Sequence, residues 1–324
     1  MSEMEGPRVD SSPRTLPGDP ARPGPTVVVG LGKTGLSCVR YLARRGLPFE
    51  VLDTRAAPPG LEALGRELPG VEPVLGPLDP ERLRRASRIV LSPGVPRRQP
   101  AVAAALAAGV PVVGDIELFA HEATAPVVAI TGSNGKSTVT TLMGDMARDQ
   151  GRDVRVGANL GTPALDLLGD REPDLYVLEL SSFQLETTDS LDAAVATVLN
   201  VSPDHMDRYD SVGDYAAAKA RVFRGTGTMV LNRDDPWVVG MATAGRPTVG
   251  FTLRAPQPGD FGLLDHAGEP WLARGGEPLL PEAELRIRGR HNTANALAAL
   301  ALGEVVGLSR PGMLETLRRF PGLA

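Results

Sequence analysis

Apolar and polar positions along the chain form blocks that predict strands and helices in turn. A short apolar run at 26–29 leads through a Gly-rich turn into a helical pattern at about 34–45, and a second strand is predicted at 49–53. Apolar runs at 88–91 and 110–113 continue the series. Strands that alternate with helices are typical of a parallel sheet covered on both faces. The pattern therefore predicts an α/β fold.

The alternation starts again near Pro126, which predicts a second α/β unit. An apolar run at 127–130 precedes another Gly-rich turn and a helix from about 136 to 150, and buried strands are expected at 175–180 and 193–199. The Pro- and Gly-rich stretch that follows favours hairpins, and two helical patterns come after it. We expect a disordered tail at 1–25, a first domain at 26–122 and a second domain at 123–324.

Composition is ordinary for a soluble globular protein, with 42% hydrophobic and 23% charged residues. No apolar run reaches the roughly 18 residues that a membrane span needs, and the first residues lack the apolar core of a secretory signal. The single cysteine, Cys38, cannot form an internal disulfide, which fits the cytoplasm. A net charge of −5 argues against general nucleic-acid binding. We expect a cytoplasmic monomer with no nucleic-acid or membrane partner.

Lysine is rare in this chain. Of the 34 Lys and Arg residues, the only lysines are Lys33, Lys136 and Lys219. A site that needs a compact ammonium, or an amine that can lose its proton, would keep lysine where the rest of the chain uses arginine.

The first Gly-rich turn, Gly30–Gly35, has the spacing G-x-G-x-x-G directly after a strand, and Asp53 ends the next strand. Backbone amides at such a helix start can hold a phosphate, and the carboxylate can accept a hydrogen bond from a ribose hydroxyl. Taken alone, this turn predicts an NAD- or FAD-linked oxidoreductase. A purely structural glycine turn is the alternative.

The second Gly-rich turn, Thr131–Thr138, holds Gly-Lys-Ser at a strand-to-helix junction, which is the context of a P-loop. Backbone N–H groups there can hold phosphate, Lys136 can reach the β and γ oxygens, and Ser137 can bind Mg²⁺. Ile130 stands where the first Walker glycine would be. We predict nucleotide contacts from Gly132, Ser133, Asn134, Gly135, Lys136, Ser137 and Thr138.

Four polar residues further along are candidates for the same chemistry. Glu179 ends an apolar strand, where an NTPase places a magnesium-linked carboxylate. His205 stands between two aspartates after the next strand, and neutral imidazole can bind a metal. Lys219 lies on a predicted helix among small residues, and the local pattern favours an exposed position. Asn292 is expected to cap the helix that it opens, with an adenine contact as the alternative.

In this order the motifs resemble the Mur ligases. The blocks that carry the resemblance are 30–37, 53–55, 92–94, 114–119, 129–141, 157–161, 178–186, 200–209, Lys219 and 289–296. The shortened glycine spacing of the second turn is specific to the Mur and folylpolyglutamate ligases, and the run Leu178–Glu186 is particular to the branch that adds D-glutamate. A folylpolyglutamate-type ligase is disfavoured, because the first-domain blocks would then have no purpose.

The resemblance implies ATP-dependent ligation of D-glutamate to UDP-N-acetylmuramoyl-L-alanine, through an acyl phosphate, in peptidoglycan precursor synthesis. The first domain would be a Rossmann-like parallel sheet that holds UDP in place of a dinucleotide, and the second would be a P-loop ATPase-like domain. Around the UDP substrate it implies Lys33, Thr34, Asp53, Thr54, Arg55, Ser92, Pro93, Gly94, Asn159 and Gln184. Asn292 and Asn295 would lie near the adenine.

The resemblance also implies catalytic roles for Lys136, Lys219 and His205. Two Mg²⁺ ions are expected, with Ser137, Glu179, His205 and Lys219 as metal ligands. Lys219 would carry a carbamate, which a neutral amine forms with CO2 and arginine cannot form at accessible pH. The family's third, amino-acid-binding domain is missing from the sequence, so we expect substrate binding with poor ligation. A non-catalytic nucleotide-binding fragment is the alternative.

Overall fold

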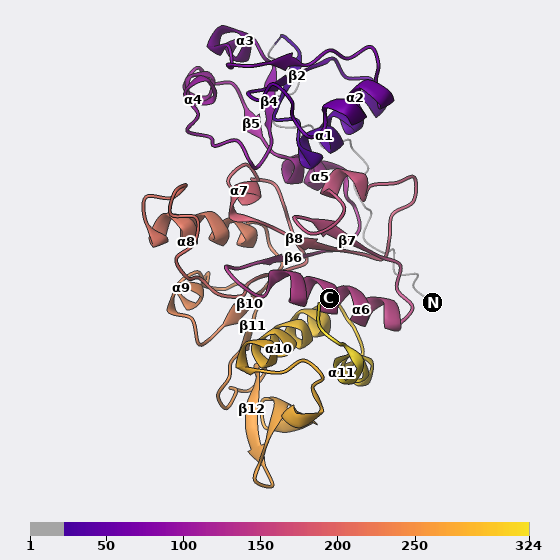
Figure 1. Cartoon of the computed structure of the whole chain (residues 1–324). Helices are drawn as coiled ribbons and strands as arrows, with labels where there is room; N and C mark the ends of the chain where they lie inside the picture. The colour runs from indigo at the N-terminus through magenta and orange to yellow at the C-terminus, as the bar shows by residue number, and fades with distance from the viewer. Residues whose placement is uncertain (1–22, 324) are drawn as a thin grey trace, which may run out of the picture.

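The structure, a computed structural model, describes residues 23–323. Two sheets follow one another along the molecule, and hairpins extend from the second (Figure 1). The predicted tail at 1–25 lies outside the described residues except for residues 23–25. The α/β fold predicted from the alternating pattern is confirmed.

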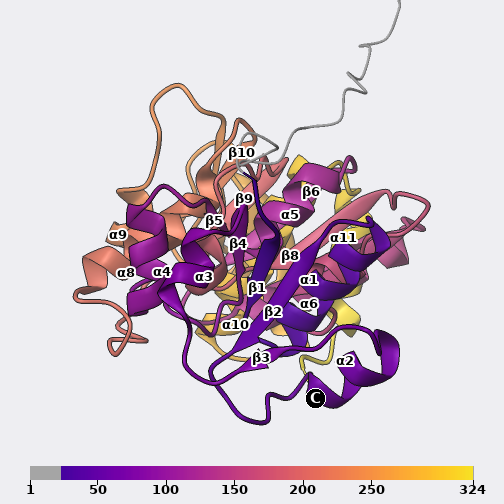
Figure 2. The same ribbon diagram turned by 90° about the horizontal axis from the view of Figure 1, so that it is seen from above.

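The first sheet has five parallel strands in the order β3-β2-β1-β4-β5. They are β1 (Thr26–Val29), β2 (Phe49–Asp53), β3 (Val74–Leu75), β4 (Arg88–Leu91) and β5 (Val112–Val113), with the helices α1 (Lys33–Arg44), α2 (Leu61–Glu67), α3 (Pro80–Arg84) and α4 (Pro100–Ala107). Val28 of β1 shares a core with Leu36 of α1, whereas Val27 packs with Leu83 of α3 and Val102 of α4. Successive residues of β1 thus face opposite helix layers, which lie on either side of the sheet in Figure 2.

The second sheet has nine strands in the order β14-β13-β12-β11-β10-β9-β6-β8-β7. They are β6 (Val127–Thr131), β7 (Val154–Ala158), β8 (Leu175–Glu179), β9 (Val195–Val198), β10 (Thr228–Asn232), β11 (Thr248–Phe251), β12 (Phe261–His266), β13 (Glu269–Arg274) and β14 (Glu277–Pro281). Strands β6 to β12 pair in parallel. The antiparallel pairs β12–β13 and β13–β14 confirm the hairpins expected in the Pro- and Gly-rich stretch.

Helices cover both faces of the second sheet. They are α6 (Lys136–Asp149), α7 (Ser182–Leu185), α8 (Val212–Ala220), α9 (Pro236–Val239), α10 (Arg290–Val305) and α11 (Arg310–Arg319), and α5 (Asp115–Glu122) precedes β6. Val128 and Ile130 of β6 share a core with α6, α10 and α11. Ala129 faces the other layer, with Phe119 of α5 and Tyr215 of α8. Burial on both faces explains why residues 127–130 of β6 are an uninterrupted apolar run.

Side-chain hydrogen bonds join the two units beside the first Gly-rich turn. The Ser37 hydroxyl donates to Asp166 at 2.9 Å, and the Arg40 guanidinium donates to the same carboxylate at 3.2 Å. The ammonium of Lys33 donates to the carbonyl oxygen of Gly161. These contacts bring the turn after β1 against the loop after β7, where the candidate site lies.

Candidate active site

The first Gly-rich turn is held by a carboxylate from the neighbouring strand. Asp53 accepts hydrogen bonds from the backbone N–H groups of Leu31 and Arg55, at 2.6 and 2.8 Å, and from the Arg55 guanidinium. Burial alone would raise the pKa of Asp53, but these hydrogen bonds outweigh it and lower the pKa to about 2. The chain itself therefore supplies the partners of this carboxylate, and Asp53 holds the turn in place.

A cavity of 530 Å³ opens between this turn and the second unit. It is lined by Lys33, Thr34, Asp53, Thr54, Arg55, Ser92, Pro93, Gly94, Asn159 and Gln184, and also by Gly30, Gly32, Val95, Ala158, Gly161 and Pro163. Every residue that the sequence assigned to the UDP substrate therefore meets in one cavity of the size typical of small-molecule sites. The sequence did not identify Val95, Ala158 or Pro163, because apolar residues in loops or at strand ends carry no chemical signal of their own.

The second Gly-rich turn connects β6 to α6 in the manner of a phosphate-binding loop. Gly135 has a φ of 84°, and a Cβ there would overlap the side-chain oxygen of Asn295, so the position requires glycine. The first N–H groups of α6 have no partner within the helix and suit an anion. The ammonium of Lys136 donates to the carbonyl oxygens of Gly132 and Ser133, each at 3.0 Å. It therefore lies folded over the turn.

Glu179 connects this turn with the cavity. Its side chain is buried at the end of β8. The Ser137 hydroxyl donates to one carboxylate oxygen at 2.7 Å, and the Asn159 amide donates to the other at 2.6 Å. Because Asn159 lines the cavity and Ser137 lies in the first turn of α6, one carboxylate touches both candidate sites.

The oxygen atoms around Glu179 suit Mg²⁺. A hydroxyl and a carboxylate oxygen 2.7 Å apart fit an ion that binds few protein ligands and keeps several waters. Within residues 23–323, no three His, Cys, Asp or Glu side chains gather closely enough to hold a metal. A magnesium site here would rest on Ser137, Glu179 and oxygens from water or substrate.

Lys219 is buried, with 1% of its surface exposed, so the expectation of an exposed helical lysine is wrong. Its Nζ donates to the carbonyl oxygen of Gly132 at 2.7 Å and lies 4.4 Å from the centre of the Tyr215 ring. Burial, reinforced by the charge of Lys136, lowers the pKa of Lys219 to about 7. Near neutral pH, roughly half of such amines are uncharged and nucleophilic.

His205 lies in the loop after β9, with about half of its side chain exposed. Its Nε2 is 3.4 Å from a carboxylate oxygen of Asp204, and its ring lies 4.8 Å from Phe183 and 6.2 Å from Tyr215 between centres. Among the residues that the structure describes, His205 makes no hydrogen bond or ion pair with Glu179 or Lys219. Its role as a metal ligand therefore stays a prediction.

Asn292 and Asn295 lie at the start of α10, beside the second turn. Gly289 is the N-cap residue of this helix, so the expected cap by Asn292 is wrong. Asn292 lies within the first turn and donates to the carbonyl oxygen of Arg288 at 2.9 Å. Its own oxygen accepts from Asn295 at 3.2 Å, and Asn295 packs against Gly135. Contact with an adenine stays a prediction.

Asp115 is a residue that sequence reasoning missed. It is buried at the start of α5 and accepts a hydrogen bond from the Gln184 amide at 3.0 Å. The amide oxygen of Gln184 accepts from the backbone N–H of Ser181, so Gln184 is held at both ends beside the cavity. The available signal was an acidic residue two positions after the apolar run at 110–113.

Replacing Asp115 with asparagine should stabilise the protein at neutral pH. Burial raises the pKa of Asp115 from 3.8 to about 6. The folded state therefore holds the proton more tightly, and this contribution to stability is lost as pH rises from about 4 to about 6. Asparagine keeps an acceptor for Gln184 without ionising, so we expect a gain of about 1–2 kcal/mol at pH 7 and none near pH 4. Urea unfolding across this pH range measures it, and equal gains at both ends would contradict it.

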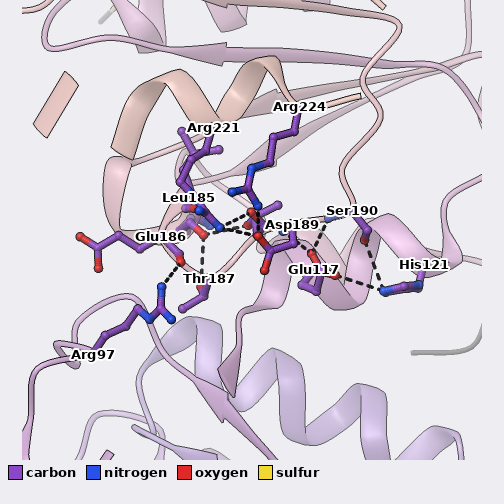
Figure 3. A network of polar contacts seen from close by, with 12 residues as sticks. Arg97, Glu117, His121, Leu185, Glu186, Thr187, Asp189, Ser190, Arg221 and Arg224 are labelled. Carbon is purple, nitrogen blue, oxygen red and sulfur yellow. Dashed lines mark hydrogen bonds and ion pairs between the residues drawn. The ribbon is translucent and has the colours of Figure 1, made fainter. Parts of the chain in front are cut away.

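A second network holds the loop between α7 and β9 (Figure 3). The Arg221 guanidinium donates to the carbonyl oxygens of Leu185 and Thr188, at 2.6 and 2.8 Å. From the first unit, Arg97 donates to the carbonyl oxygen of Glu186 at 2.8 Å. These contacts fix the loop that follows Gln184 from both units.

Ser190, His121 and Glu117 in this network do not form a nucleophilic triad. Ser190 and Glu117 both approach the same imidazole nitrogen, Nε2, at 3.3 and 3.2 Å (Figure 3). A triad needs the acid on the opposite ring nitrogen, where it orients the base. The buried Glu117 carboxylate instead accepts from the N–H groups of Asp189 and Ser190, which is a structural role.

Two family models match the chain on both sides of α5. Residues 24–114 match the N-terminal domain of MurD-like Mur ligases, and residues 130–303 match the Mur ligase middle domain. The chain belongs to the Mur ligase family. The matched ranges contain the Gly-rich turns of both units, so the resemblance seen in the sequence motifs is confirmed.

Among proteins similar to this Mur ligase chain is the UDP-N-acetylmuramoylalanine–D-glutamate ligase of Nitrosococcus oceani, 57% identical over 298 residues. The enzyme of the same name from Pseudomonas aeruginosa is also 57% identical. Each alignment covers 92% of this chain and 66% of the relative. The chain thus spans just under two thirds of the length of these relatives.

Solved Mur ligases share the fold. The UDP-N-acetylmuramate:L-alanyl-gamma-D-glutamyl-meso-diaminopimelate ligase of Neisseria meningitides superposes with a TM-score of 0.63 at 19% identity and covers 93% of this chain. The UDP-N-acetylmuramate-alanine ligase of Thermotoga maritima gives 0.55 at 20% identity over 92% of this chain. At such low identity the agreement concerns the fold alone. No helix within residues 23–323 has the length and apolar character to cross a bilayer.

Proposed function

We propose that this chain carries the UDP-substrate site and the ATP site of an enzyme that ligates D-glutamate to UDP-N-acetylmuramoyl-L-alanine in peptidoglycan precursor synthesis. The observation that supports this most directly is the contact of Glu179 with both Asn159 and Ser137. Through it, the cavity with all the candidate UDP residues adjoins the phosphate-binding turn. The 57% identity to two D-glutamate ligases favours this substrate pair.

The proposed chemistry activates a carboxylate that would otherwise resist an amine. Phosphoryl transfer from ATP to the alanyl carboxylate gives an acyl phosphate, the amine of D-glutamate attacks its carbonyl carbon, and phosphate leaves. Lys136 would turn from the carbonyl oxygens of Gly132 and Ser133 toward the transferred phosphoryl group and neutralise its charge. Ser137 and Glu179 would hold Mg²⁺, which supplies further charge neutralisation when bound.

We also propose that Lys219 carries the carbamate and helps to hold a second Mg²⁺ with His205. The support is the burial of Lys219 and its pKa of about 7, which leaves a neutral amine to attack CO2. The amine lone pair forms the new N–C bond, one C–O π bond becomes a carboxylate oxygen, and the amine loses a proton. The product is an anion, which the positive charge of Lys136 attracts and no longer repels.

For the rest of the chain, we propose a boundary between the two domains at 122/123, between α5 and β6. We further propose a cytoplasmic monomer that uses neither nucleic acid nor a membrane. The Asn292 and Asn295 pair would border the adenine of ATP, since Asn295 packs against Gly135 of the phosphate-binding turn.

Calorimetric titration with UDP-N-acetylmuramoyl-L-alanine tests the first domain directly. We expect saturable binding of this ligand and none of NAD, because the two relatives at 57% identity are named for this substrate. Arg55→Ala should lower the affinity for the UDP ligand about tenfold, since it removes a cation that lines the cavity. Binding of NAD without binding of the UDP ligand would show that the first Gly-rich turn is a dinucleotide site.

The matched control is Arg82→Ala. Arg82 is an arginine of the same domain that pairs with Glu50 at 2.9 Å and does not line the cavity. We expect its affinity for the UDP ligand to stay within about twofold of the unchanged protein. Equal losses in the two variants would point to a general effect of arginine removal and contradict a role for Arg55.

A further inference from the structure

The segment after β9, Asn200–Ser202, is hydrogen-bonded to the phosphate-binding turn. The backbone N–H of Ser133 donates to the carbonyl oxygen of Asn200 at 2.9 Å. The Ser133 hydroxyl donates to the carbonyl oxygen of Ser202 at 3.1 Å and accepts from the N–H of Ser202 at 3.0 Å. These bonds join segments about 65–70 residues apart in sequence, which meet because β6 and β9 are neighbouring parallel strands.

The side chain of Asn200 binds Asn134 as a neighbouring backbone strand would. Its amide oxygen accepts from the backbone N–H of Asn134 at 2.9 Å, and its amide nitrogen donates to the carbonyl oxygen of Asn134 at 3.0 Å. Both backbone groups of one residue are thereby fixed. The next residue is Gly135, whose left-handed conformation begins α6. The direction from which the chain enters α6 therefore depends on Asn200.

Because of these bonds, some N–H groups of the turn are already occupied and others are available to a phosphate. Those of Ser133 and Asn134 are engaged by Asn200, so they are not free to hold a phosphate. The N–H groups at the start of α6, from Lys136 onward, have no partner within the helix. A phosphate would bind to these, and its affinity depends on how well they are aligned before it arrives.

We propose that Asn200 is a positioning residue of the nucleotide site, which fixes Asn134 and Gly135 so that the first turn of α6 is ready to receive the phosphates of a nucleoside triphosphate. The proposal rests on the proposed function for the ATP site and extends it to a residue outside the Gly-rich turn. Asn200 acts through the turn and touches no substrate. Without it, the backbone N–H and C=O of the exposed Asn134 lose their partners, and the residue keeps only a side-chain bond of 3.4 Å to the Ser202 hydroxyl. Nucleotide binding must then order this part of the turn.

Two variants and a control separate positioning from general stability. Asn200→Ala removes both side-chain bonds to Asn134. Asn200→Asp keeps an acceptor for the backbone N–H of Asn134, but it places a carboxylate oxygen next to the carbonyl oxygen of Asn134, where the two repel. The control, Asn232→Ala, removes a similar bond at the next strand end, where the amide donates to the carbonyl oxygen of Leu199 at 2.8 Å. Asn232 has no bond to the phosphate-binding turn among the described residues.

Calorimetry with the non-hydrolysable analogue AMPPNP plus Mg²⁺ measures one site, and UDP-N-acetylmuramoyl-L-alanine measures the other. We expect both Asn200 variants to bind AMPPNP roughly 5- to 30-fold more weakly, with the UDP ligand unchanged within about twofold. Asn232→Ala should leave both affinities within about twofold. Loss of AMPPNP affinity alone is not what a general structural defect would produce.

The outcomes distinguish this proposal from the one on which it rests. If the unchanged protein binds AMPPNP and Asn200→Ala binds it equally well, the role of Asn200 is overturned while the nucleotide site stands. Equal weakening of both ligands would also overturn it, because Asn200 would then support the fold in general. If the unchanged protein does not bind AMPPNP, the proposed nucleotide site fails, and the role of Asn200 fails with it.

Discussion

Lys219→Met should stabilise the ligand-free protein by on the order of 2–4 kcal/mol at pH 7. The side chain of Lys219 is buried, and its one hydrogen bond among the described residues goes to the carbonyl oxygen of Gly132. Methionine has a similar length and needs no hydration. Lys136 also donates to that carbonyl oxygen, so the oxygen keeps a partner in the variant. The folded protein would lose a buried charge without gaining an unpaired acceptor.

The gain should depend on pH in one direction. The pKa of Lys219 is about 7 in the folded protein, below the 10.5 of a free lysine. The cost of burying the charged amine is therefore fully present below pH 7 and fades as pH rises toward 10.5. Urea unfolding at about pH 6.5 and about pH 9.5 should show a smaller gain at the higher pH. A gain that does not change with pH would attribute the effect to packing.

Lys33→Met is the matched control for this prediction. Lys33 is exposed, and its ammonium reaches only the carbonyl oxygen of Gly161 among the described residues. Its replacement should change the free energy of unfolding by less than about 0.5 kcal/mol at either pH. If Lys219 carries the carbamate, the unchanged protein should also give a carbonyl signal with ¹³C-labelled CO2 in NMR spectra, and Lys219→Met should not.

The secondary structure was predictable wherever burial was uniform. Strands β1, β2, β4 and β6 lie within one residue of the predicted strands, because each is covered on both faces or ends at a turn. Strand β7 was missed because it lies at the edge of its sheet and is only partly buried, so its residues do not form an apolar run. Strand β5 is shorter than the run at 110–113, since Pro111 has no N–H to donate to the sheet.

The candidate site was predictable where one residue carries its own chemical signal. Lys136 and Ser137 follow from the Gly-rich turn, and Glu179 follows from a carboxylate at a strand end. The burial of Lys219 was not predictable, because it depends on packing against Gly132, far away in the sequence. The partners of Gln184 and Asn134, which are Asp115 and Asn200, were hidden for the same reason. Such pairs depend on strand order, which local sequence patterns do not contain.

Lys136→Ala should weaken binding of AMPPNP with Mg²⁺ by roughly 30- to 1000-fold. The ammonium lies over the turn, 3.0 Å from each of two carbonyl oxygens, so its charge is placed beside the turn that would hold the phosphates. Lys136→Arg should restore little, since a planar guanidinium cannot replace a compact ammonium folded over so tight a turn. The affinity for UDP-N-acetylmuramoyl-L-alanine should stay within about twofold, because Lys136 does not line the cavity.

The same variant should alter Lys219. The charge of Lys136 helps to lower the pKa of Lys219, so its removal should raise that pKa toward the free value. The stability of Lys136→Ala should then rise less steeply between about pH 7 and about pH 10 than that of the unchanged protein. Unfolding curves across this range measure the slope. If the free energy of unfolding changes with pH as steeply in Lys136→Ala as in the unchanged protein, the two ammonium groups do not interact. The proposed carbamate would then have no repulsion between them to offset.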